Sequence, residues 1–137
     1  MQHIVEALST SAGRMIGTPG HLAAREYLVG QLSAIEGVVP LGDSFVLPYG
    51  PASFELANVM AQIPGTNPQA EPVVLGAHYD TCGPYPGADD NAAAVAILLE
   101  LAPKVVEAKL ERPVILAFFD GEEPPCFLTD DMGSTHW

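Results

Sequence analysis

The chain has 137 residues and a formal net charge of −12, from 17 acidic and 5 basic residues. This length corresponds to one domain or part of one, and a hydrophobic fraction of 48% excludes a generally disordered chain. The acidic balance disfavours nucleic-acid binding, which needs a basic face, and it provides no basic cluster for an anionic membrane. We therefore expect neither nucleic acid nor membrane as a partner. Most of the acidity is interpreted as solvated surface, with carboxylates grouped around cations as the alternative.

The two cysteines and the hydrophobic pattern bear on the compartment. Cys82 and Cys126 do not form a Cys-x-x-Cys pair, so the sequence predicts no thiolate zinc site. One disulfide and two free thiols both remain open. The first ten residues do not read as a secretory signal, and no uninterrupted apolar stretch reaches the roughly 18 residues of a membrane span. The compartment stays open between cytoplasmic and secreted after processing.

Two helices are expected at the start of the chain, over residues 2–15 and 21–35, because apolar side chains recur there at helical spacing. The turn sequence of residues 17–20 separates them, and Gly37 closes the second helix. His3 and His21 are interpreted as helix-surface or capping residues.

Extended segments are expected next. Residues 44–47 form a short one, and residues 54–63 form a better strand that ends at Pro64 and Gly65. The polar, turn-rich residues 65–72 are expected to be a surface loop.

A strand–helix–strand unit follows. Residues 72–77 and 113–119 are short apolar runs, typical of strands buried on both faces. Residues 91–106 read as a helix of small and aliphatic side chains, which Pro103 is expected to kink or end early. This order predicts a right-handed parallel crossover.

The last part of the chain is expected to be loop over residues 122–133, with a helix beginning near Met132. A sheet with so few strands would also leave an edge exposed, which makes self-association an option. The sequence does not determine the oligomeric state.

Potential metal ligands follow the first apolar run. His78 comes directly after it, and Asp80 lies two residues further on. Because residues i and i+2 of a strand point the same way, Asp80 can sit beside the His78 ring, accept its free N–H and fix the tautomer. On its own, such a pair is more often structural than metal-binding.

Carboxylates also gather at the start of the helix and after the second apolar run. Asp89, Asp90 or Asn91 could cap the helix, or one of the two aspartates could bridge two metal ions. Glu122 and Glu123 could be a solvated loop. Alternatively, because neighbouring side chains diverge, one could bind metal while the other faces water. Imidazole and carboxylate are ligand types that zinc prefers.

Taken together, these segments resemble a known family, the zinc exopeptidases that include bacterial leucyl aminopeptidase and aminopeptidase Y, with the glutaminyl cyclases as distant relatives. The matching stretches are RMIGTPGHLAAREYL, NVMAQIPG, GAHYDT, PGADDNAAAVAILLELA, FFDGEE and MGS. The resemblance covers nearly all of the chain but only the N-terminal part of a family catalytic domain. It implies an α/β fold: a three-layer sandwich with a mixed, largely parallel sheet and helices on both faces, incomplete at the C-terminus.

The resemblance also implies roles for individual residues. His78, Asp90 and Glu123 match metal ligands, with Asp90 bridging two Zn²⁺ ions and the Asp90–Asn91 bond cis in the family. Asp80 matches the partner that orients His78. Glu122 matches the general base that takes a proton from the attacking water.

Two further ligands of the family, an Asp and a His, lie in segments beyond residue 137. His136 follows Glu123 too closely to be that His, and Asp130 and Asp131 lie where the missing Asp is not expected. The resemblance thus implies a zinc-dependent aminopeptidase acting on peptides, with this chain as residues 1–137 of a single catalytic domain and inactive alone. A glutaminyl-peptide cyclotransferase and a non-catalytic truncated relative are the alternatives.

Overall fold

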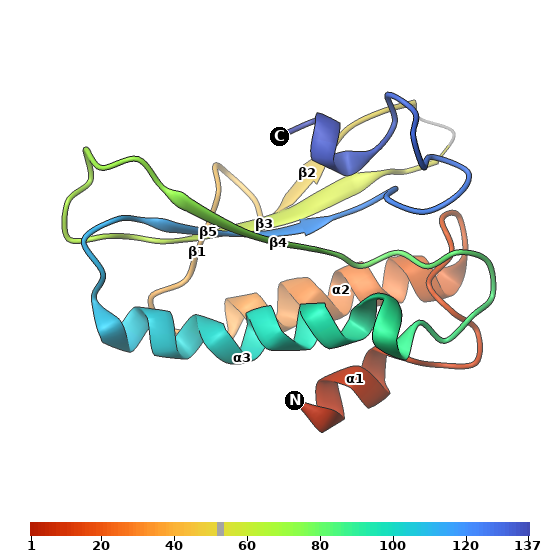
Figure 1. Ribbon diagram of the computed structural model, residues 1–137, viewed down its shortest axis with the longest axis horizontal. Coiled ribbons are helices and arrows are strands. Elements are labelled where there is room, and N and C mark those ends of the chain that lie inside the picture. Colours follow the sequence, from red (N-terminus) through yellow and green to blue (C-terminus); the bar gives the residue numbers. More distant parts are fainter. Residues whose placement is uncertain (52–53) are drawn as a thin grey trace.

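The computed structural model describes residues 1–51 and 54–137, which form one sheet covered by helices (Figure 1). The strands run in the order β1–β3–β5–β4, with β2 also paired to β3. Their bounds are Val39–Pro40 for β1, Val46–Pro48 for β2, Ala57–Ile63 for β3, Val73–His78 for β4 and Val114–Phe119 for β5.

The sheet is mixed, as predicted, but less parallel than expected. Only β4 and β5 pair in parallel, whereas β1, β2 and β5 each pair antiparallel with β3. For β2 and β3 the reason is connection length, since a short loop joins them and favours antiparallel neighbours. A parallel pair needs a longer crossover, which the helix between β4 and β5 supplies.

Two of the three α-helices in the described ranges, α2 (Pro19–Ser33) and α3 (Ala93–Ala108), pack on one face of this sheet, and α1 (Gln2–Leu8) lies on the same side, against α3 (Figure 1). The α/β class with a mixed sheet is confirmed. Of the two helical layers expected, the described residues form one. The opposite face carries the C-terminal loop and its 3₁₀ turn, η2 (Gly133–Thr135). None of the helices in the described part of the chain is both long enough and apolar enough to cross a membrane.

The main core lies between the helices and the sheet. Leu28 and Leu32 of α2 and Val95 of α3 are fully buried against Leu116 and Phe118 of β5. Buried apolar area stabilises a fold by about 25 cal/mol per Å², so this layer holds β4 and β5 in place at the ends where the site forms.

Several helix boundaries differ from the prediction. The first helix ends at Leu8 and not near residue 15, because the chain turns at Gly13 (φ +65°) and directs Arg14 inward. The second begins two residues early, where the Thr18 side chain accepts a hydrogen bond from the His21 N–H.

The third helix begins at Ala93, two residues later than predicted, and the expectation that Pro103 ends it early is wrong. The helix continues to Ala108. Pro103 lies on the exposed side, while Ala102 and Val105 are buried, so packing of the inner side maintains the helix past the missing hydrogen bond.

Strand β4 is not buried on both faces, which corrects the prediction for residues 72–77. It is an edge strand, with Val73 exposed and Val74 and Leu75 half-buried, whereas β5 is buried along most of its length. A continuous apolar run alone does not distinguish a central strand from an edge strand.

The remaining predicted segments are close to the structure. The strand expected over residues 54–63 begins at Ala57, after a turn in which Glu55 has a φ of +50°. The expected loops over residues 65–72 and 122–133 contain no helix or strand apart from the first residue of η2.

The two cysteines are free: Cys82 is exposed and Cys126 is buried. Burial raises the pKa of the Cys126 thiol, which lowers its thiolate fraction at neutral pH. We expect one rapidly reacting thiol per native chain in a disulfide-exchange assay with a chromogenic reagent, and a second only after denaturation. The variant C82S should lose the fast phase, and two fast thiols in the native wild-type protein would contradict this arrangement.

Candidate metal centre

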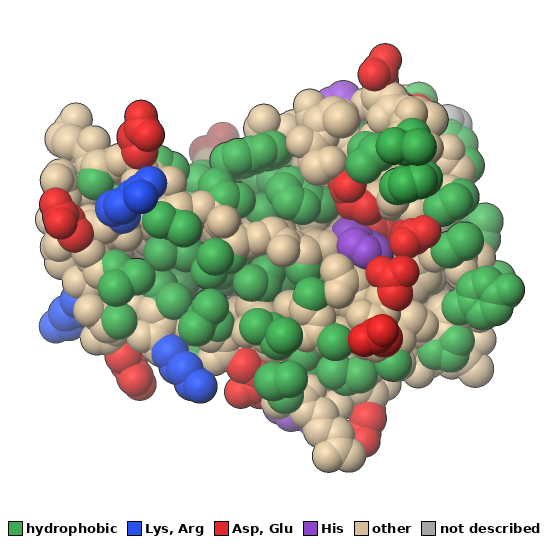
Figure 2. Space-filling view, viewed as in Figure 1, with side chains coloured by type: hydrophobic (Ala, Val, Ile, Leu, Met, Phe, Trp, Pro, Cys, Tyr) green, Lys and Arg blue, Asp and Glu red, His purple; other side chains and the backbone are tan. Residues whose placement is uncertain are grey.

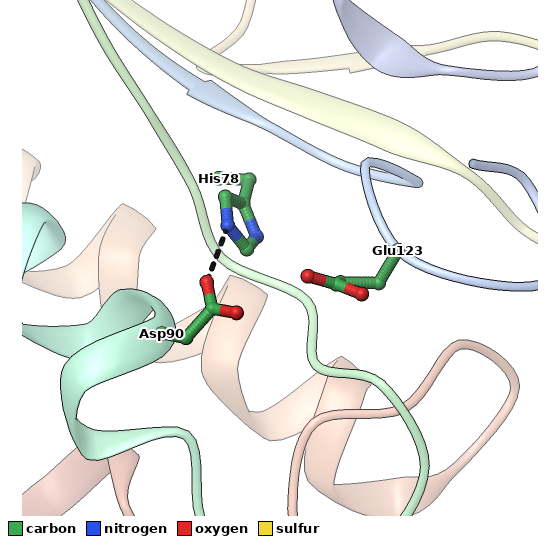
Figure 3. Close-up of side chains that lie close together, drawn as sticks. All are labelled: His78, Asp90 and Glu123. Carbon is green, nitrogen blue, oxygen red and sulfur yellow. Dashed lines mark hydrogen bonds and ion pairs between the residues drawn. The ribbon is translucent and has the colours of Figure 1, made fainter. Parts of the chain in front are cut away.

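Three side chains from separate segments converge at the carboxyl ends of β4 and β5. His78 is the last residue of β4, Asp90 lies in the turn before α3, and Glu123 lies in the loop after β5 (Figure 3). One ligand atom from each lies within 4.8 Å of the others, and His78 Nε2 is 3.0 Å from Asp90 Oδ1. Because β4 and β5 are parallel neighbours, their ends meet at one edge of the sheet, which is where α/β proteins place their sites.

Asp80 links the two strand ends beneath these side chains. It is fully buried, and its Oδ1 lies 3.3 Å from His78 Nδ1, as the strand geometry predicts. Its carboxylate also accepts hydrogen bonds from the backbone N–H groups of Glu122 (3.3 Å) and Glu123 (2.9 Å). Asp80 thus lies beside the His78 ring and holds the loop that carries Glu123 through two backbone hydrogen bonds.

Burial and charge act against each other in this cluster. Burial lowers the pKa of His78, but Asp80, Asp90 and Glu123 outweigh it, so the pKa is raised. The pKa of Glu123 is raised by burial and by the negative charge of Asp90. A cation bound between these carboxylates would offset their mutual repulsion and favour their ionised forms. One imidazole nitrogen with two carboxylates is a donor set that fits zinc.

The turn before α3 directs Asp90 toward His78. Gly87 adopts a left-handed conformation, Asp90 is extended (φ −116°, ψ 91°), and the Asp90–Asn91 peptide bond is cis, as the family resemblance implied. The alternative that Asp89, Asp90 or Asn91 caps the helix is wrong, because no side chain caps α3. The Asp90 side chain is 72% exposed beside the half-buried His78 and is accessible to an ion.

Glu122 is not one of the three clustered side chains, and its carboxylate contacts Ser134 instead. Its Oε1 accepts the Ser134 N–H at 2.7 Å and its Oε2 accepts the Ser134 hydroxyl at 3.0 Å. The expectation that Glu122 and Glu123 diverge is confirmed. Ser134 lies in η2, and the first N–H groups of a helical turn lack partners within the turn, so they favour a carboxylate as acceptor. The role of Glu122 as base stays a prediction.

The interpretation of His21 as a surface or capping residue is wrong. His21 is fully buried and stacks on Tyr79, with ring centroids 5.5 Å apart. Its Nε2 lies 2.7 Å from Oδ1 of the buried Asp120, which also accepts from the Tyr79 hydroxyl at 2.8 Å. No local pattern links His21 to Asp120 across 99 positions, so sequence reasoning missed this network.

The other histidines agree with the sequence interpretation. His3 is exposed on α1. His136 is exposed and stacks on Tyr49, with ring centroids 4.5 Å apart. Neither belongs to the cluster of potential metal ligands found among the described residues, and neither do Asp130 and Asp131.

Apolar side chains surround the acidic cluster at the surface. Figure 2 shows a histidine bordered by acidic side chains, with hydrophobic side chains on either side. Tyr85, from the loop after β4, and Phe127 and Leu128, from the loop after Glu123, are exposed. The acidic cluster thus lies on a face that also carries hydrophobic side chains.

Comparisons with known proteins agree with this geometry. Residues 58–137 match the sequence profile of Peptidase family M28. The chain is 44% identical over 70 residues to YfbL of Escherichia coli, covering 45% of this chain and 22% of YfbL. It is 32% identical over 120 residues to the glutaminyl-peptide cyclotransferase of Drosophila melanogaster, covering 80% of this chain and 33% of that protein.

A solved structure has the same fold. The leucine aminopeptidase precursor from Bacteroides thetaiotaomicron superposes with a TM-score of 0.68 at 24% identity, over 88% of this chain and 46% of that one. The chain spans about a third or less of the length of the curated relatives it matches first. Peptidases of family M28 are zinc-dependent. A glutaminyl-peptide cyclotransferase is among the sequence relatives of this chain, and a leucine aminopeptidase precursor shares its fold. The profile match and the converging donor set together show that this chain belongs to Peptidase family M28.

Proposed function

We propose that this chain forms part of a zinc-dependent exopeptidase of aminopeptidase type, related to bacterial leucyl aminopeptidase and aminopeptidase Y. The observation that carries the proposal is the convergence of His78, Asp90 and Glu123 from three separate segments onto one accessible point. The family match and the likeness to a leucine aminopeptidase precursor support it. Residues 1–137 would be the N-terminal part of a single catalytic domain.

The proposed roles follow from the contacts. His78, Asp90 and Glu123 would hold zinc, with Asp90 between two ions, and Asp80 would keep His78 in the tautomer that binds metal. When bound, zinc supplies Lewis acidity toward a peptide carbonyl and makes water more acidic.

Glu122 would take the proton of the attacking water and pass it to the leaving amine. Each of its oxygens accepts one hydrogen bond from Ser134. Because a carboxylate oxygen has two lone pairs, each oxygen keeps one with which to accept that proton.

The decisive test uses the zinc-loaded full-length protein and a panel of aminoacyl anilides. We expect release of the anilide product, and a loss of about 100-fold or more in kcat in Glu122→Gln, because a positioned base contributes about 10² to 10⁴ in rate. The zinc content of this variant should be unchanged. Glu107→Gln, an exposed position on α3, is the matched control. Failure of the wild-type protein to hydrolyse any anilide of the panel would count against the proposal.

A second candidate is glutaminyl-peptide cyclotransfer, favoured by the 32% identity to the Drosophila enzyme over 80% of this chain. This reaction releases ammonia from a peptide with N-terminal Gln, whereas an aminopeptidase releases the free amino acid. Mass spectrometry of one glutaminyl peptide separates the two activities. A third candidate, a non-catalytic relative, predicts no change in thermal stability on addition of zinc, because an ion that binds the native state must stabilise it.

A further inference from the structure

Arg14 is a buried cation whose side chain binds only backbone carbonyl groups. It lies between α1 and α2, is 1% exposed, and makes no ion pair within the described ranges 1–51 and 54–137. Its Nε donates to the carbonyl oxygen of Tyr79 at 2.7 Å, Nη1 to those of Leu8 (2.6 Å) and Pro86 (2.8 Å), and Nη2 to that of Gly87 (3.0 Å).

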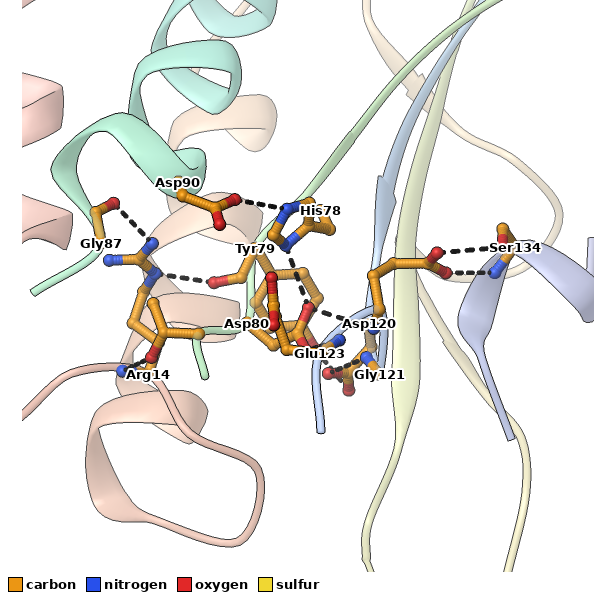
Figure 4. Close-up of polar contacts among 12 residues, drawn as sticks. Arg14, His78, Tyr79, Asp80, Gly87, Asp90, Asp120, Gly121, Glu123 and Ser134 are labelled. Carbon is orange, nitrogen blue, oxygen red and sulfur yellow. Dashed lines mark hydrogen bonds and ion pairs between the residues drawn. The ribbon is translucent and has the colours of Figure 1, made fainter. Parts of the chain in front are cut away.

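Three of these four carbonyls, those of Tyr79, Pro86 and Gly87, belong to the two ends of one loop, residues 79–87. The fourth, that of Leu8, belongs to the last residue of α1. Tyr79 lies between His78 and Asp80, and Gly87 comes directly before the turn that carries Asp90 (Figure 4). The middle of the loop is attached as well, because the Arg14 N–H donates to Thr81 Oγ1 at 2.7 Å and the Thr81 N–H donates to the Arg14 carbonyl at 3.3 Å. One residue thus connects the segments that position His78 and Asp90.

Two glycines make this close approach possible. A Cβ at Gly87 would lie 2.8 Å from Arg14 Nη2, and one at Gly13 would lie 2.7 Å from the carbonyl oxygen of Tyr85. Both glycines also have positive φ, which side-chain-bearing residues rarely adopt. The backbone is therefore shaped around the guanidinium.

We propose that Arg14 is a positioning residue of the metal centre: its guanidinium sets the placement of His78 relative to Asp90 and thereby the affinity of the site for zinc. This inference rests on the proposed function in so far as His78, Asp90 and Glu123 hold the metal.

The alternative role for Arg14 is electrostatic, and it predicts the opposite sign. A buried cation near Asp80 and Asp90 would repel Zn²⁺, so its removal would strengthen zinc binding. Loss of positioning would weaken binding, because replacing groups that orient metal ligands typically costs about 10- to 100-fold in affinity. Lysine separates the two effects. It keeps the charge, but its ammonium has three donors on a flexible stem and cannot reproduce a planar fork that spans four carbonyls.

The experiment measures zinc affinity of full-length wild-type protein and Arg14→Lys by competition with a chromogenic chelator. It also records the Co²⁺ absorption spectrum, which reports ligand geometry, and the circular dichroism of the metal-free proteins. We expect a folded variant with zinc affinity reduced about 10- to 100-fold and an altered Co²⁺ spectrum. Arg25→Lys is the matched control, because Arg25 also donates to a backbone carbonyl, but to that of Glu55, which is not part of loop 79–87. Its affinity and spectrum should equal those of wild type.

A second variant keeps the test decisive if lysine disturbs folding. In Arg14→Ala, added methylguanidinium should recover part of the zinc affinity, whereas methylammonium at the same concentration should not. Unchanged or stronger zinc binding in a folded Arg14→Lys, or equal recovery by both ions, would overturn the positioning role. A wild-type protein that binds no zinc would overturn the proposed function instead, so the two failures are distinguishable.

Discussion

Replacing Asp120 with alanine is expected to destabilise the protein by about 3–5 kcal/mol, the largest stability effect that we predict for a single substitution. The buried carboxylate accepts four hydrogen bonds, from His21 Nε2, the Tyr79 hydroxyl, and the backbone N–H groups of Ala57 and Gly121. A buried donor left without a partner costs about 1–3 kcal/mol. The substitution would remove hydrogen bonds that connect α2, β3 and the segments after β4 and β5.

The measurement is thermal unfolding of the metal-free protein followed by circular dichroism. A loss of this size lowers Tm by roughly 10–20 °C in a domain of this length. Asp130→Ala is the matched control, because Asp130 is exposed and contributes only its backbone carbonyl to the hydrogen bonds with Thr135 and His136. Its Tm should stay within a few degrees of wild type.

Asp120→Asn refines the same prediction. The variant keeps the side-chain volume, but one carboxylate oxygen becomes an amide NH₂ group, which donates hydrogen bonds. In one orientation this NH₂ faces His21 and the Gly121 N–H, and in the other it faces the Tyr79 hydroxyl and the Ala57 N–H. Each orientation therefore sets the amide donor against a backbone N–H that also donates. We expect a clear loss of stability even though no cavity is created. A Tm equal to that of wild type in either Asp120 variant would show that the network contributes little.

The second large effect is expected on metal binding. Asp90→Asn should lower zinc affinity by about 100-fold or more, because it neutralises a proposed ligand, and even replacing the partners of ligands costs about 10- to 100-fold. The chain offers an internal control one position away, since Asp89→Asn makes the same change of charge at an exposed carboxylate outside the cluster.

Zinc competition and metal content after desalting provide the readout for these two variants. Loss of negative charge near the site would lower the zinc affinity of both variants to a similar, small extent. Loss of a ligand would lower the zinc affinity of Asp90→Asn alone. Equal zinc affinities for the two would contradict the assignment of Asp90. Stability of the metal-free protein should change little, because the Asp90 side chain is 72% exposed and its contact with His78 is at the surface.

The order of the elements could be read from the sequence for local physical reasons, whereas the ligand set came from the family resemblance. Apolar runs of strand length end directly at His78 and Asp120, and a run of small and aliphatic residues between them has helix length. This order predicts parallel strands and a crossover, and parallel neighbours bring their carboxyl ends to one edge. The segments that carry His78, Asp90 and Glu123 could therefore be grouped before any coordinates were known, and the family resemblance singled out these residues within them.

Only the tertiary structure decided which polar residues lie inside. Arg14 and His21 sit in or beside helical sequence, where an isolated charged or polar residue reads as surface, yet both are buried. The Tyr79 carbonyl that Arg14 contacts lies 65 residues further along the chain, and the Asp120 carboxylate that His21 contacts lies 99 residues further along. Of the Arg14 partners, the Leu8 carbonyl is the one that is near in sequence. The placement of Glu122 on Ser134 likewise depends on where the C-terminal turn packs.

The physical distinction is between interactions set by chain neighbours and those set by packing. Periodicity, turn residues and strand-end position act within a few residues, so the sequence by itself determined the α/β class, the succession of strands and helices, and which polar segments lie at the strand ends. The edge position of β4, the network around Asp120 and the hydrogen bonds of Arg14 to residues 79–87 could be found only from the fold. They arise because a buried polar group must find a partner wherever the packed chain offers one.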